Sequence, residues 1–112
     1  MYLGYIKSRH LNIIKWEDEN GKVQRFYLTE KIAHKWRTIG ELLGLPYSKL
    51  QSLDHEYRDR FESCRAVLDL WLDDPPPKYP ATWQGLIDLL EKSQLDEVAT
   101  ELRTVLSKAI DL

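Results

Sequence analysis

Residues 59–92 read DRFESCRAVLDLWLDDPPPKYPATWQGLIDLLEK. This stretch predicts two amphipathic helices separated by a stiff loop. Asp59 followed by Glu62 forms a capping box for the first helix, and Thr82 is a suitable N-cap for the second. Four of the five prolines fall in residues 73–80, and no helix persists through that density. A polyproline ligand is the alternative interpretation of this loop. The expected inward faces are Phe61, Cys64, Leu68 and Trp71 or Leu72, then Trp83, Leu86, Ile87 and Leu90.

The chain on either side of this stretch, from Thr29 onward, also has apolar residues spaced by three and four, which is typical of helices. Periodicity alone allows one long helix over residues 29–43. Most of the predicted segments open with a residue that can cap a helix, so the whole remainder is expected to be helical. The other predicted caps are Thr29, Ser48 with Gln51, and Ser93 with Asp96, and Gly44 is predicted to end a helix.

The N-terminal part differs, because residues 11–28 read LNIIKWEDENGKVQRFYL and contain Asn20-Gly21, a preferred pair for a tight hairpin turn. We therefore predict a short N-terminal β-hairpin. An isolated hairpin is marginally stable, so it should pack on the helices or belong to an upstream module. The expected organisation is an extension over residues 1–27 and a helical domain over residues 28–112.

Composition indicates one folded domain, since the chain has 112 residues, of which 43% are hydrophobic and 30% charged. The net charge of -2 gives no electrostatic basis for broad nucleic-acid binding. Residues 1–60 carry eleven basic and eight acidic side chains, a net of +3, whereas residues 61–112 carry five and ten, a net of -5. Such a split can orient one copy relative to another.

Cysteine content and hydropathy indicate a cytoplasmic protein. Cys64 is the single cysteine, so no internal disulfide can form. No apolar run is long enough to span a membrane, and Lys7 and Arg9 interrupt the start of the chain where a secretory signal would be apolar. We expect no membrane insertion.

The sequence offers no catalytic or cofactor site. The three histidines, His10, His34 and His55, lack a second ligand at metal-site spacing, and His55-Glu56 fails the zinc-protease pattern because Asp59 stands where histidine is required. The glycines form no phosphate-binding motif. We expect Cys64 to be a buried, inert thiol and the chain to be neither an enzyme nor a cofactor carrier.

The order of these pieces resembles the death domains, the six-helix modules of apoptotic and innate-immune signalling, over about residues 28–107. The resemblance implies an all-α, six-helix antiparallel Greek-key bundle with a break just before Trp36. It also implies a noncatalytic adaptor that binds other death domains, of the same or a different protein, in an open-ended homo- or hetero-oligomer. It is carried by IAHKWRTIGELLGLP (32–46), SKLQSLDHEY (48–57), SCRAVLDLWL (63–72) and TWQGLIDLLEKSQLDEVATEL (82–102).

The resemblance further implies three kinds of asymmetric contact, in which one surface of a copy meets a different surface of the next. Netrin-receptor-like and ankyrin-like proteins place such domains after β-rich modules, which is a possible origin of residues 1–27. By position, the second and third helices offer Arg37, Glu41, Lys49 and Asp54; the first and fourth offer Lys31, Lys35, Glu62, Arg65 and Asp69; and the corner after the fourth offers Asp73, Asp74 and Lys78 to a loop near residues 92–94.

Two alternatives come from other functional classes. The domain can be a structural or autoinhibitory element that packs on an upstream β-rich module. It can also be a helix-turn-helix that binds nucleic acid, although the acidic residues 61–112 argue against phosphate contacts.

Overall fold

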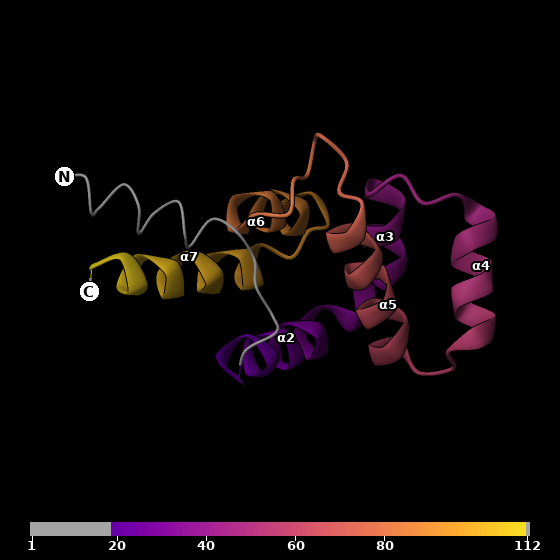
Figure 1. The fold of residues 1–112 in the computed structure, drawn as a ribbon, viewed down its shortest axis with the longest axis horizontal. Coiled ribbons are helices and arrows are strands. Elements are labelled where there is room, and N and C mark those ends of the chain that lie inside the picture. The colour runs from indigo at the N-terminus through magenta and orange to yellow at the C-terminus, as the bar shows by residue number, and fades with distance from the viewer. Residues whose placement is uncertain (1–18, 112) are drawn as a thin grey trace.

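The computed structural model describes residues 19–111, with the side chains of residues 25–104, and this part of the chain contains helices and no β-strand. Figure 1 shows α3 and α5 side by side at the centre, α4 at one end, and α2, α6 and α7 toward the other. The elements are α2 (Glu19–Ile32), the 3-10 helix η1 (Ala33–Lys35), α3 (Trp36–Leu42), α4 (Tyr47–Glu56), α5 (Arg60–Asp73), α6 (Trp83–Lys92) and α7 (Asp96–Asp111).

The hydrophobic core forms around α5, which contacts α2, η1, α3 and α4. Trp71 is only 1% exposed whereas Leu72 is half-buried, so Trp71 occupies the inward position that the sequence left open between them. Burial of such large side chains supplies most of the stabilisation of a bundle of short helices. The largest fully buried side chains are Trp71, Ile32, Ile39, Leu50, Leu68, Leu86, Ile87, Leu89 and Leu90.

Two of the predicted helix caps are confirmed. The Asp59 carboxylate accepts a hydrogen bond from the Phe61 backbone N–H at 3.0 Å, and α5 begins directly after it. The Thr82 hydroxyl accepts one from the Gly85 N–H, also at 3.0 Å, at the start of α6. These bonds satisfy N–H groups that have no partner within the helix.

The break before Trp36 and the stop at Gly44 are confirmed as well. A 3-10 turn separates α2 from α3, which begins at Trp36. Gly44 has a φ of 87°, and its N–H donates to the Glu41 carbonyl while Leu45 N–H donates to the Gly40 carbonyl. This is a Schellman motif, which needs a left-handed residue and so favours glycine.

The other predicted helix starts are wrong. Thr29 lies inside α2, where its hydroxyl donates to the Arg25 carbonyl at 2.6 Å. The hydroxyl of Ser93, at the end of α6, likewise donates to the Leu89 carbonyl at 2.8 Å, and α7 starts only at Asp96. Serine and threonine can bond the carbonyl four residues back, so they also occur within and at the ends of helices.

The predicted Ser48–Gln51 capping box is also wrong. α4 begins at Tyr47, with Pro46 in extended conformation at the cap position and no side-chain cap hydrogen bond. Proline is tolerated at a helix start because its missing N–H is not needed there.

The predicted N-terminal hairpin is wrong where the structure describes it. α2 runs from Glu19 to Ile32 and includes Asn20-Gly21, the expected turn, and the expected second strand. Leu28 and Ile32 are buried in the core, and this packing stabilises helix against a weak local turn preference. The first strand lies outside the described residues. The division into residues 1–27 and 28–112 stays a prediction, although α2 continues across that boundary.

The loop between α5 and α6 interrupts the helices, as predicted, and is tied to α5. The Tyr79 N–H donates to the Pro76 carbonyl at 3.0 Å, which closes a turn. The buried Trp71 indole N–H donates to the Tyr79 carbonyl at 2.7 Å and ties the loop to α5. A turn of this kind interrupts the continuous extended conformation that a polyproline ligand adopts.

Candidate interaction surface

The exposed face of α3 and α4 is organised around Arg37. Its guanidinium donates to the Asp54 carboxylate at 2.7 Å and lies 5.1 Å from the centre of the Trp36 ring. Arg37 also lies 3.5 Å from the Gln51 side-chain oxygen. Both Arg37 and Asp54 were predicted to meet a neighbouring molecule, and here they pair with each other.

The same face carries a large exposed aromatic side chain, Tyr47, which is 71% exposed. Its hydroxyl accepts a hydrogen bond of 3.0 Å from the Gln51 side-chain amide, and Gln51 links it to Arg37. Glu41, on α3, is exposed as well. An ordered tyrosine among charges is a frequent component of protein interfaces.

A second face is formed by α2 and α5. The Arg25 guanidinium forms an ion pair with the Asp69 carboxylate across the two helices. On the same two helices, the Phe26 and Phe61 rings lie 5.0 Å apart, and Phe26 remains 58% exposed. Sequence analysis missed Arg25 and Phe26 because it placed both in a strand.

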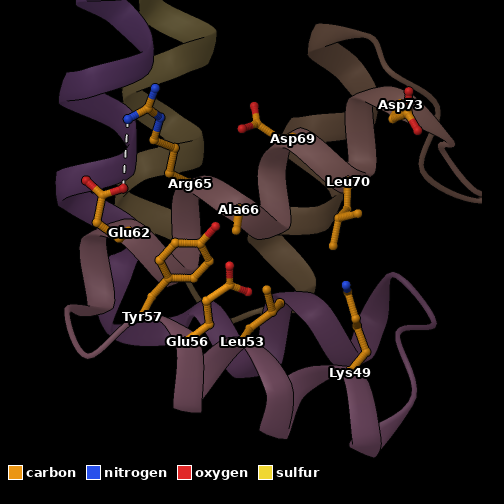
Figure 2. A pocket seen from close by; sticks show the side chains of 10 residues that line it. All are labelled: Lys49, Leu53, Glu56, Tyr57, Glu62, Arg65, Ala66, Asp69, Leu70 and Asp73. Carbon is orange, nitrogen blue, oxygen red and sulfur yellow. Dashed lines mark ion pairs between the residues drawn. The ribbon is translucent and has the colours of Figure 1, made fainter.

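A groove of ≈ 620 Å³ lies between α4 and α5 (Figure 2). It brings five of the predicted interface residues into one place, although the prediction divided them among three surfaces. Sequence analysis missed its other lining residues, because their helices were predicted but not the gap between them. The lining residues are Lys49, Leu53, Glu56, Tyr57, Glu62, Arg65, Ala66, Asp69, Leu70 and Asp73.

The corner after α5 carries two acidic residues that were predicted to contact a neighbouring molecule, Asp73 and Asp74. Asp73 is the last residue of α5 and Asp74 its C-cap, and both are exposed. Negative charge is unfavourable at a helix C-terminus, so a basic partner would relieve it. Lys78 is exposed in the following loop, 5.6 Å from the centre of the buried Tyr79 ring.

Lys31 and Lys35 lie near the junction of α2 and α3, away from the groove. The Lys31 ammonium lies 5.2 Å from the Tyr27 ring centre, and the Tyr27 hydroxyl lies 3.5 Å from the Glu101 carboxylate of α7. The pKa of Lys31 is raised above its ordinary value, first by hydrogen bonding with Tyr27 and then by the negative charges of Tyr27 and Glu101.

The described residues contain no cluster of three or more metal-ligating side chains, and no helix among them is long and apolar enough to cross a membrane. His34 and His55 are both exposed. Cys64 is fully buried, as predicted, and this desolvation raises the pKa of its thiol from 9.0 to about 12.

The Cys64 pKa predicts a loss of stability at alkaline pH. Because the folded-state pKa lies above the unfolded one, the contribution is complete below pH 9.0 and is lost as pH rises toward about 12. The free energy of unfolding, measured by urea titration, should therefore fall more steeply above pH 9.0 in the native chain than in Cys64→Ala. Parallel pH profiles for the two proteins would contradict this assignment.

Comparison with known proteins agrees with this architecture. A profile of the death-domain family matches residues 22–106, and the chain belongs to that family. Over 80 residues it is 31% identical to p53-induced death domain-containing protein 1 of Mus musculus, a match that covers 70% of this chain and 9% of the relative. No solved structure matches the chain significantly. Death domains are in general non-catalytic protein–protein interaction modules.

Proposed function

We propose that this chain is a noncatalytic module that binds other death domains, copies of itself included, and so assembles signalling complexes of the apoptotic or innate-immune type in the cytoplasm. The proposal rests on two separate exposed faces of a death domain that each carry charges of both signs. One face is formed by α3 and α4, and the other by α2 and α5. The proposed fold is the six-helix Greek-key bundle of the family.

Arg37 and Asp54 pair within the chain at 2.7 Å. Their side chains are 39% and 55% exposed, and ion pairs in such positions contribute only about 0.2–1 kcal/mol. Replacing this intrachain ion pair by ion pairs with a neighbouring molecule therefore costs little free energy. The intrachain pair keeps both side chains in place until the neighbour arrives.

The charge of the chain is unevenly distributed along the sequence. Residues 1–60 carry a net charge of +3 and residues 61–112 a net charge of -5, and attraction between opposite charges on two copies steers their encounter. A contact between different surfaces leaves one of each kind free, so assembly continues instead of closing as a symmetric pair. We propose that the corner residues Asp73, Asp74 and Lys78 supply a further contact in such an assembly.

Size-exclusion chromatography with light scattering tests this proposal. The mass should rise above that of a monomer with increasing protein concentration, and it should fall again at high salt, because salt screens contacts between exposed charges. The death domain of the mouse relative serves as a second probe in a mixture. A monomer at every concentration and salt, alone and mixed, would contradict the proposal.

A further inference from the structure

The groove between α4 and α5 has two helical walls. The α5 wall runs from Glu62 to Asp73, which corresponds to about 16 Å, or three turns, at the rise of an α-helix. The α4 wall runs from Lys49 to Glu56 on the opposite side (Figure 2). The space between the walls is therefore elongated, and its length suits a short helix.

The floor of the groove is apolar, because the hydrophobic core reaches the surface there. Leu53 belongs to the core, and Ala66 and Leu70 are half-buried against it. In Figure 2, Leu70 points from α5 toward α4. A strip of aliphatic side chains at the bottom of a groove is the feature that receives the apolar face of an amphipathic helix.

The rim of the groove is acidic, with four carboxylates against the two basic groups of Lys49 and Arg65. Arg65 lies 3.8 Å from Glu62, a long ion pair between exposed groups. Glu56 and Asp73 have no ion-pair partner within residues 25–104. Their unpaired charges favour a cationic occupant.

From this geometry we propose that the groove binds a basic, amphipathic helical segment of a partner protein. Its aliphatic side chains, spaced three and four residues apart, pack on Leu53, Ala66 and Leu70, and its flanking lysines or arginines pair with Glu56 and Asp73. This binding goes beyond the proposed assembly, because it does not require a second death domain.

The probe for this site is a synthetic, end-capped helical peptide of about 14 residues, with one leucine face and flanking lysines and arginines. Fluorescence anisotropy gives its affinity for the full chain, and NMR shift mapping gives its location. Binding should produce shifts along α4 and α5. A peptide with glutamates in place of the basic residues, and one with serines in place of the leucines, should each bind at least tenfold more weakly.

Matched variants locate the binding. Glu56→Gln with Asp73→Asn should weaken the basic peptide about tenfold, whereas Asp96→Asn with Glu97→Gln, the same charge change outside the groove, should not. Ala66→Gln should also weaken binding, because it fills the floor without changing charge. This variant can perturb the fold, so its thermal melt is compared with that of the native chain. Glu56 and Asp73 are both exposed, so the variant Glu56→Gln with Asp73→Asn provides a test that does not depend on Ala66→Gln.

The proposal is overturned if the Asp96 and Glu97 variant weakens the peptide as much as the groove variant, or if the shifts lie elsewhere. Arg37→Glu separates this site from the assembly face of α3 and α4. Arg37 does not line the groove, so peptide binding should persist in this variant even where association between death domains is lost. Loss of both would show that the peptide occupies the face of α3 and α4 instead of the groove.

Discussion

Replacing Gly85 by alanine is expected to destabilise the domain by about 3 kcal/mol, the upper part of the range for overpacking substitutions. A Cβ atom at Gly85 would lie 2.0 Å from the carbonyl oxygen of Pro80, a backbone atom. That carbonyl cannot retreat easily, because it accepts a 2.7 Å hydrogen bond from Thr82 N–H, and the loop before it is tied to Trp71 through Tyr79. Thermal denaturation should show a fall in Tm of roughly 10 to 20 °C.

Gly44→Ala is the matched control for this substitution. Gly44 has a φ of 87°, but a Cβ atom there meets nothing within 4 Å. The expected cost is only about 1 kcal/mol, from the left-handed backbone alone. If the Tm of Gly85→Ala is no lower than that of Gly44→Ala, the loop does not pack closely against α6.

Reversing charge on either proposed assembly face should abolish association while the fold persists. Arg37→Glu places two carboxylates together at Asp54 and presents the wrong charge to a neighbour, and like charges across an interface cost several kcal/mol. Association should weaken by at least about a hundredfold, the equivalent of about 2.8 kcal/mol. The unfolding free energy should change by no more than about 1 kcal/mol, because Arg37 and Asp54 are exposed.

The charge-swapped variant Arg37→Glu with Asp54→Arg is the control for this prediction. It should restore the intrachain ion pair and the thermal stability, but it leaves each charge at the wrong position for a neighbour. Sedimentation velocity measures association, and circular dichroism measures the fold. Full recovery of association by the swap would show that the pair acts only within the chain.

Helix boundaries were predictable from the sequence at Asp59, Thr82 and Gly44, and not at Thr29 and Ser93. Asp59 and Thr82 cap helices, and Gly44 takes the left-handed conformation that ends one. Thr29 and Ser93 instead bond carbonyls within their own helices, an alternative that the same residue types always offer. Capping residues therefore marked some of the helix starts and not others.

Contacts between distant parts of the chain were not predictable in the same way. The Arg25–Asp69 pair joins residues 44 positions apart and exists only because α2 packs on α5. The Asn20-Gly21 pair favoured a turn locally, but burial of Leu28 and Ile32 stabilises a helix there. The groove likewise depends on how α4 sits beside α5, which neither helix encodes alone.

The most direct test of the assembly mechanism mixes two variants that are disabled on different faces. Arg37→Glu alters the face of α3 and α4, and Asp69→Lys alters the face of α2 and α5, where Asp69 pairs with Arg25. Each variant alone should sediment as a monomer. An equimolar mixture should form a dimer that grows no further, because each variant keeps the face that the other lacks. If the mixture remains monomeric while the native chain assembles, contacts between unlike faces are wrong.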